Sequence, residues 1–386
     1  MDIEEIKKFR RELHQHPEIS GKEQETAKRI AARLSTLNPA VLQTGIGGHG
    51  VMALFSRDEK QNRKQIAFRA ELDAISVQEE SQLPYKSKVE GVMHGCGHDG
   101  HMAILIALAD KLQKEPLENL AVWLLFQPAE ETGKGAEKMI DNSFFQELKI
   151  ERMIALHNLP GFEENEILIR EGVFAAASTG IKVIFTGSSS HAAQPEEGVN
   201  PAPHMAEFVT FVENEFHSFK NRSSVNNIVV TYLHLGERAF GISPGRGEAG
   251  VTLRSDDPQE LESALCRIEK QLGKVEKQFE GQITFQKEEP FAMTENDSKG
   301  IDVVKKAAAE LDLDIRDLDS PFPWSEDFGA FEAACPITFF GLGAGKGHPP
   351  LHSATFDFNE NLLSPGAEIF YKIAELYDQG ESSVDL

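Results

Sequence analysis

The strongest constraint on the fold is an alternation of short apolar runs with helical segments. The apolar runs occupy residues 51–55, 65–70, 121–126 and 153–157. Each has the length and composition of a buried strand. Between the second and third runs, residues 101–113 are apolar over a helical length, and residues 3–15 and 23–36 show helical spacing. Strands that alternate with helices predict an open, mostly parallel α/β sheet.

The pattern changes near residue 175. Strand, helix, strand, strand, helix and strand are expected in that order at residues 179–187, 199–217, 226–236, 247–255, 257–274 and 281–286. This β-α-β-β-α-β order is typical of a compact, ferredoxin-like α+β unit. Because 386 residues exceed one ordinary core, we expect two domains. A smaller domain at 175–288 would be inserted into a discontinuous larger one, 1–174 and 289–386, in which the α/β pattern resumes.

Composition narrows the range of partners. A formal net charge of −23 opposes binding to nucleic acid or to an anionic membrane, and it is compatible with binding of cations. No stretch approaches the roughly 18 consecutive apolar residues that a membrane span needs, and the first residues contain no apolar signal segment. Three cysteines cannot build a disulfide framework. The cytoplasm is therefore the expected location.

The run MHGCGHDGHMA at residues 93–103 concentrates side chains that bind metals. Cys96 and His98 flank a glycine, and a turn there can direct both side chains to one point. A thiolate and an imidazole are ligands that suit zinc and related transition metals. A solvated polar loop is the alternative interpretation. His94 and His101 are weaker candidates, and His101 is expected to begin the following helix, with either a structural role or a role in supporting the metal ligands.

Polar side chains also follow the predicted strands, where sites form in open α/β sheets. Asp73 follows the second apolar run, Glu130 and Glu131 follow the third, and His157 ends the fourth. The two glutamate side chains diverge, so that one can ligate a metal while the other transfers protons. As alternatives, an adjacent glutamate pair is usually a solvated face, and a lone histidine on a strand is usually a core residue.

A Gly/Pro-rich loop at residues 343–358 presents His348 and His352, and either could be an ordinary loop histidine. With this loop, the candidate ligands are Cys96, His98, Glu131, His157 and His352. Glu130 is then not needed as a ligand and can transfer protons. Five protein ligands exceed the three or four of a single zinc site. Two ions that share a bridging ligand would use all five.

Several sequence blocks, taken in order, resemble those of a known family. They are RELHQHPEISGKEQET, RAELDAI, MHGCGHDGHMA, FQPAEETGKGAEKMI, ALHNLP, SHAAQPEEGVNP, TLRS, WSEDFGAF and LHSATFDFNE. They are spread over nearly the full length of the chain and resemble the aminoacylase/carboxypeptidase-type dinuclear metallopeptidases, peptidase family M20. Within that family the chain is similar to the branch of N-acyl-amino-acid, hippurate and auxin-conjugate amidohydrolases. One block alone would be weak support, whereas this many in order are specific.

The resemblance implies roles for the candidate residues. Cys96 would bridge two divalent ions, which could be zinc, manganese, nickel or cobalt. Glu130 would be the general base, and Asp73 would orient His98 through its other ring nitrogen. His191, in the inserted domain, would stabilise the oxyanion, often from a dimer partner. The inserted domain would then serve as lid and homodimer interface, and the larger domain would bind the metals.

The resemblance also implies a reaction, the hydrolysis of the amide bond in small N-acylated amino acids or related amides. Arg254 and Glu326 are possible contacts to this small-molecule substrate, and a surface salt bridge is the alternative for each. Glu71 replaces the family's usual aspartate, while Gly241 and Ser243 replace an asparagine and an apolar residue that bear on specificity. A dipeptidase or aminopeptidase of the same superfamily and a non-catalytic, metal-dependent binding protein are the alternative functions.

Overall fold

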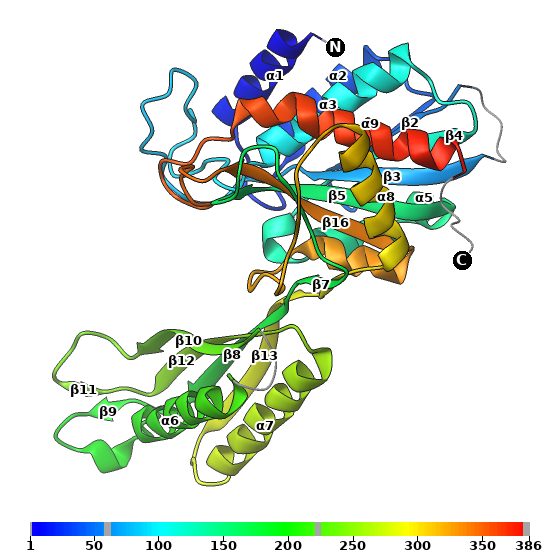
Figure 1. The fold of residues 1–386 in the computed structure, drawn as a ribbon. Helices are drawn as coiled ribbons and strands as arrows, with labels where there is room; N and C mark the ends of the chain where they lie inside the picture. The colour runs from blue at the N-terminus through cyan, green and yellow to red at the C-terminus, as the bar shows by residue number, and fades with distance from the viewer. Residues whose placement is uncertain (1, 58–62, 221–224, 381–386) are drawn as a thin grey trace. The chain divides into compact units, whose positions relative to one another are not determined.

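The computed structural model of this chain describes residues 2–57, 63–220 and 225–380. The chain forms two compact units, each with its own hydrophobic core (Figure 1). The first unit consists of Met1–Phe174, Thr294–Asp319 and Asp327–Leu386, and the second of Ala175–Met293 and Ser320–Glu326.

An eight-stranded sheet in the order β1-β2-β4-β3-β5-β16-β6-β15 forms the centre of the first unit. Its strands are β1 (Val41–Ile46), β2 (Gly50–Phe55), β3 (Lys64–Glu71), β4 (Leu120–Gln127), β5 (Ile150–Pro160), β6 (Ile167–Ile169), β15 (Ile315–Asp317) and β16 (Ile337–Gly345). The central strands β4, β3, β5 and β16 are parallel neighbours, whereas β1 and β2 are antiparallel additions at one end. The predicted α/β class with a mostly parallel central sheet is confirmed. A separate two-stranded sheet pairs β7 (Gly172–Ala175) with β14 (Thr294–Asn296).

Helices cover the sheet of the first unit. They are α1 (Ile3–Gln15), α2 (Gln24–Ser35), α3 (His98–Lys114), α4 (Gly135–Ile140), α5 (Ser143–Gln146), α8 (Ser298–Glu310) and α9 (Leu363–Asp378), with short 3-10 helices η1 (Glu130–Thr132), η3 (Asp327–Ala333) and η4 (Glu360–Leu362). Asp2 caps α1, because its side chain accepts hydrogen bonds from the main-chain N–H groups of Glu4 and Glu5. Most of α3 is buried, and it packs against β3, α1 and α9. Burial on several sides explains why its sequence lacks a polar stripe.

Two boundaries beside the candidate residues differ from the sequence expectation. Helix α3 begins at His98, so His101 lies in its first turn instead of at its start. Strand β5 continues to Pro160, so His157 lies within the strand instead of at its end. The pairing of β5 with β3 does stop at Ala155, but its pairing with β16 continues to Pro160. His157 is thus held by one neighbouring strand only.

The second unit is a four-stranded antiparallel sheet in the order β10-β12-β8-β13, with two helices on one face (Figure 1). Its elements are β8 (Ala177–Thr186), β9 (Ser190–His191), η2 (Pro195–Glu197), α6 (Ala202–Phe219), β10 (Asn226–Leu235), β11 (Ile242–Ser243), β12 (Arg246–Ser255), α7 (Pro258–Glu276) and β13 (Gln282–Phe291). The long elements follow the β-α-β-β-α-β order. The short strands β9 and β11 pair with each other and lack the length that a sequence pattern requires.

The length and apolar character of the helices bear on membrane insertion. Within the described ranges, no helix combines the two to the degree that crossing a membrane requires.

Candidate metal centre

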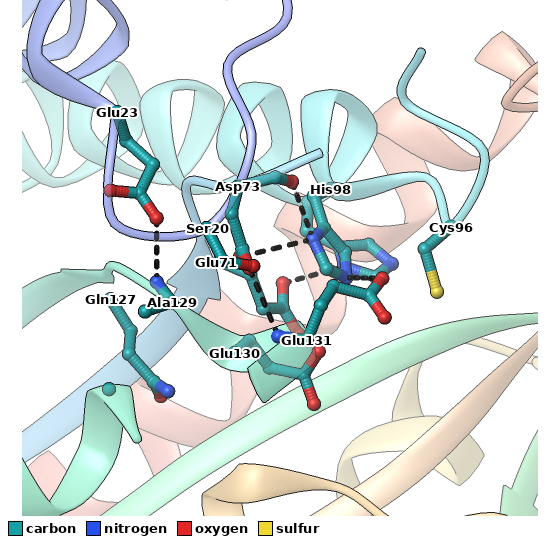
Figure 2. Close-up of polar contacts among 12 residues, drawn as sticks. Ser20, Glu23, Glu71, Asp73, Cys96, His98, Gln127, Ala129, Glu130 and Glu131 are labelled. Atoms are coloured by element: carbon teal, nitrogen blue, oxygen red, sulfur yellow. Dashed lines mark hydrogen bonds and ion pairs between the residues drawn. The ribbon is translucent and has the colours of Figure 1, made fainter. Parts of the chain in front are cut away.

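Loops that follow neighbouring parallel strands bring most candidate residues together. Asp73 follows β3, and Glu130 and Glu131 form the start of η1 after β4. Because β3 and β4 are parallel and adjacent, these loops meet at one edge of the sheet. Figure 2 shows Asp73, Glu130 and Glu131 beside His98.

A glycine turn places Cys96 and His98 at the same edge. Gly97 has a left-handed φ of 93°, and a Cβ atom on it would lie 2.3 Å from Asn158 Oδ1. Only glycine allows this approach and this conformation. The turn therefore ends with His98 as the first residue of α3, and Cys96 lies one residue before the turn.

His352 arrives from the loop after β16. Its main-chain N–H donates to the carbonyl oxygen of Gly95 at 2.8 Å, which ties this loop to the segment before Cys96. Its φ of 63° is left-handed, a conformation that costs free energy in a non-glycine residue and is often found at functional sites. His352 Nε2 lies 3.7 Å from Glu131 Oε1, and His98 Nε2 lies 3.9 Å from the same oxygen.

The potential ligand atoms form overlapping groups. Those of Cys96, His98 and His157 all lie within 4.8 Å of one another, and so do those of Cys96, Glu131 and His352. Two further groups meet the same limit among the described residues, Glu71 with His98 and His101, and His98 with Glu130 and Glu131. Only the first two groups share Cys96, and together they contain all five predicted ligands. Such an arrangement can hold two cations with the thiolate between them.

Hydrogen bonds orient both buried histidines for metal binding. His98 Nδ1 donates to the main-chain carbonyl of Asp73 at 2.8 Å, whereas the Asp73 carboxylate is 3.6 Å away. Asp73 thus contacts the predicted ring nitrogen, but mainly through its backbone. His157 Nδ1 donates to the carbonyl of Asn158 at 2.8 Å. Each ring therefore directs Nε2 away from the backbone contact, and Nε2 of His157 faces Cys96 Sγ at 3.4 Å.

The electrostatics of the centre favour a cation. His98 Nε2 and Glu131 Oε1 are buried and have no hydrogen-bond partner among the described residues. Such atoms are costly unless a cation or a proton compensates them. Burial lowers the pKa of His98, but the carboxylates of Glu71 and Asp73 outweigh it and raise this pKa to about 10. The residues present therefore fit divalent metal ions, with sulfur, nitrogen and oxygen donors in one place.

Glu130 is held by a residue that the sequence analysis did not identify. Its Oε1 accepts the main-chain N–H of Asp327 at 3.2 Å, and Glu130 is only 5% exposed. The carboxylate of Asp327 in turn accepts from Gln127 Nε2 at 2.6 Å and from the first N–H groups of α4. Asp327 follows Glu326 in the block WSEDFGAF, which was the only available signal. It links the end of β4 to η3.

The other histidines of the sequence analysis lie elsewhere or have other partners. His101 is held between Glu71 Oε2 at 2.8 Å and Asn158 Oδ1 at 2.7 Å. Glu71, the departure from the family pattern, is thus the buried partner of His101. His94 is buried, which lowers its pKa to about 3. His348 donates through Nδ1 to its neighbour's carbonyl and is in none of the ligand groups found among the described residues.

His191 lies in the second unit and is exposed. It is on β9, directly opposite Ile242 of β11. The two departures at Gly241 and Ser243 lie on the same ribbon. The carbonyl of Gly241 accepts the N–H of Ala192 at 3.0 Å, and Ser243 pairs with the residue before His191. His191 and the two substituted positions are therefore neighbours through backbone pairing.

The two tentative substrate contacts also belong to the second unit. Arg254 Nη1 donates to the hydroxyl of Ser325 at 2.9 Å. Glu326 is only 2% exposed, so it is not a surface charge. Their roles toward a substrate stay predictions.

Comparison with known proteins gives consistent matches over the whole chain. The family model of peptidase family M20/M25/M40 matches residues 67–376. An uncharacterised hydrolase of Staphylococcus saprophyticus is 31% identical over an alignment of 395 residues, which covers 99% of each chain. The crystal structure of the Bacillus subtilis YXEP protein, described as a dinuclear metal binding peptidase of the M20 family, has a TM-score of 0.80 at 24% identity and covers 98% of both chains. A putative aminohydrolase from methicillin-resistant Staphylococcus aureus has a TM-score of 0.83 at 24% identity, over 98% of this chain and 96% of that one.

Proposed function

This chain belongs to peptidase family M20/M25/M40 and is a hydrolase, and we propose that it is a dinuclear metal-dependent amidohydrolase. The proposed substrates are small N-acylated amino acids or related amides, whose amide bond is cleaved. The observation that carries this proposal is the pair of ligand groups that share Cys96. The aminohydrolase and dinuclear descriptions of the two solved relatives support it.

Two divalent ions, zinc, manganese, nickel or cobalt, are the proposed cofactors. Cys96, His98 and His157 would hold one, and Cys96, Glu131 and His352 the other. When bound, such ions supply a Lewis acid for the scissile carbonyl oxygen and lower the pKa of the attacking water. The mixed thiolate, imidazole and carboxylate set suits all four metals.

Glu130 is the proposed proton carrier. It is buried beside Glu131, and its hydrogen bond from Asp327 fixes the orientation of the carboxylate. Glu130 would accept a proton from the attacking water and then donate it to the departing nitrogen, which is a poor leaving group as an anion. Asp73 would keep both His98 and Glu131 in place through its backbone and side chain.

The second unit supplies the proposed lid and dimer interface. His191 would donate a hydrogen bond to the oxyanion, and its exposed position on β9 is compatible with that role. Strand β10 is at an edge of its sheet and exposes Val229, Leu233 and Leu235 by 45%, 53% and 41%. Such an apolar edge favours pairing with another strand, and we propose that a second copy of the chain covers it.

A substrate panel on protein of measured metal content tests the function. The panel contains N-acetyl and N-benzoyl amino acids and dipeptides, with added Mn²⁺ or Zn²⁺, and release of free amine is measured for wild type and Glu130→Gln. We expect hydrolysis of the acylated amino acids by wild type alone. Preferential cleavage of dipeptides would assign the alternative peptidase activity. If neither wild type nor Glu130→Gln hydrolyses any substrate of the panel, the alternative of a non-catalytic binding protein is supported.

A further inference from the structure

The N-terminal segment 18–23 is fastened to the loop that follows β3. The N–H of Ala74 donates to the carbonyl of Glu18 at 2.9 Å, and Ile19 forms a β-bridge with Ala74. Next to them, Ser20 Oγ donates to Asp73 Oδ2 at 2.7 Å. This segment comes from the block RELHQHPEISGKEQET, to which neither the ligand set nor the proton transfer assigns a role.

The same segment ends on the loop that follows β4. Glu23 Oε1 accepts the N–H of Ala129 at 2.8 Å (Figure 2). The same oxygen accepts the N–H of Gly21 at 2.7 Å. Glu23 occupies the N-cap position of α2, yet its side chain makes no capping hydrogen bond. It is completely buried. A buried carboxylate that does not cap its own helix needs other hydrogen-bond partners, because burial of a polar group without them is unfavourable.

Ala129 needs such a partner. Its φ of 52° is left-handed, and the residue is 4% exposed. A non-glycine residue keeps this conformation only where its surroundings hold it. Glu130 and Glu131 come next in the chain and begin η1, so the conformation of Ala129 sets the direction in which the chain enters this turn.

We propose that Glu23 is a positioning residue for the turn that carries Glu130 and Glu131, with Ser20 as its auxiliary. Glu23 holds Ala129 at the start of the turn. Ser20 acts at the other end through Asp73 Oδ2, which also accepts the N–H of Glu131 at 3.0 Å. The importance of this turn for catalysis rests on the proposed function, whereas the hydrogen bonds themselves do not.

Two substitutions of Glu23 separate the effect of side-chain length from the effect of charge. Glu23→Gln keeps an oxygen within reach of Ala129 but removes the charge. Glu23→Asp keeps the charge but is shorter by one methylene group and loses the contact. Glu25→Ala is the matched control, because Glu25 lies two positions away in the first turn of α2 and is exposed.

Three measurements on the full-length protein test the proposal. Amide hydrogen exchange of a peptide that covers residues 127–133 is followed in the metal-free protein. Binding of Mn²⁺ alone is measured by equilibrium dialysis, and kcat and KM are measured on the best N-acyl amino acid. For Glu23→Ala and Glu23→Asp we expect at least about tenfold faster exchange. We also expect about 10–100-fold weaker Mn²⁺ binding, and a similar loss of kcat with little change in KM.

Rescue by the amide decides between hydrogen bonding and charge. Glu23→Gln should recover most of the lost protection and Mn²⁺ affinity, Ser20→Ala should show a smaller loss in the same direction, and Glu25→Ala should match wild type. The proposal is overturned if Glu23→Asp keeps wild-type exchange and Mn²⁺ affinity, or if Glu23→Gln is as impaired as Glu23→Ala. Should Glu23→Ala not fold, the same measurements on Glu23→Asp and Ser20→Ala decide the question. A wild-type protein without activity would refute the proposed function. Hydrogen exchange and Mn²⁺ binding would still test the positioning role of Glu23.

Discussion

Sγ of Cys96 lies 3.4 Å from Nε2 of His157, across 61 residues of sequence. The same sulfur also belongs to the group formed with Glu131 and His352. A thiolate has lone pairs for two cations, so a single side chain can serve both ligand groups. The contact therefore makes Cys96 the residue on which the proposed dinuclear centre depends most.

Replacement of Cys96 by serine should reduce bound metal from two ions per chain toward one or none. The serine hydroxyl is a poor ligand for the proposed metals at neutral pH, and both groups would lose their common member. Elemental analysis after dialysis against Mn²⁺ or Zn²⁺ measures the change. Cys266→Ser, at an exposed position, is the control and should bind metal as wild type does. Full metal retention by Cys96→Ser would contradict the shared-ligand arrangement.

Glu130→Gln should lower kcat by about 10²–10⁴-fold, because the amide cannot carry a proton between water and the leaving nitrogen. Bound metal should stay at the wild-type level, since the neighbouring Glu131 is the proposed ligand. Kinetics and metal analysis of the same preparation provide both numbers. Glu137→Gln, at an exposed position in α4, controls for loss of a nearby negative charge. A Glu130→Gln protein that loses metal together with activity would place Glu130 among the ligands.

Stability should fall between pH of about 6.5 and about 9 because of His14. Burial lowers the pKa of His14, but the carboxylates of Asp99 and Glu79 outweigh it and raise this pKa to about 9. The folded state therefore holds a proton that the unfolded state releases near its ordinary pKa of about 6.5. The contribution is complete below that value and is lost as the pH rises through the folded pKa.

The expected loss over this range is on the order of 3 kcal/mol in the free energy of unfolding. Urea unfolding at several pH values measures it, and His14→Gln should make the decline shallower by this amount, leaving the part that His98 contributes through its raised pKa of about 10. His16→Gln, two positions further along, is the control and should keep the wild-type slope. An equally steep curve for His14→Gln would show that another group causes the decline.

A charge on the edge strand β10 should weaken the proposed dimer. Leu233 is 53% exposed on this strand, and Leu233→Lys would bury an unpaired ammonium group in a strand-to-strand interface. Light scattering after size-exclusion chromatography should show a shift from dimer to monomer. Ile315→Lys is the matched control, because Ile315 is 38% exposed on β15 at an edge of the larger sheet. A wild type that is monomeric at micromolar concentration would refute the proposal directly.

Mixed dimers should reveal whether His191 acts on its own subunit or on its partner. Inactive His191→Ala and inactive Glu130→Gln are combined under conditions in which subunit exchange is shown by differential labelling. If His191 acts across subunits, one site of each mixed dimer is complete, and part of the activity should return. Activity that stays at the level of the separate variants would confine His191 to its own subunit or remove it from catalysis.

Local sequence determined the long elements and the family. The apolar runs of β2, β3 and β4 and the helical spacing of α1 and α2 are local patterns, so the positions of these elements could be predicted to within a few residues. The blocks around Cys96, Glu130 and His352 identified the family, which the comparisons confirm. Strand β1 was missed because it is mostly exposed or half-buried and lacks an apolar run, and β6 was missed because its three residues are too few for a pattern.

Only the tertiary structure decided how the centre is held together. Contacts between segments far apart in the chain hold the centre together. The Asp73 carbonyl orients His98, the Asp327 N–H binds Glu130, and Glu23 binds the N–H of Ala129. A hydrogen bond to a backbone group leaves no signature in the identity of the residue that supplies it. The sequence therefore identified the candidate metal-binding side chains, because their residue types alone indicate that chemistry. The residues that position them were revealed only by the tertiary structure.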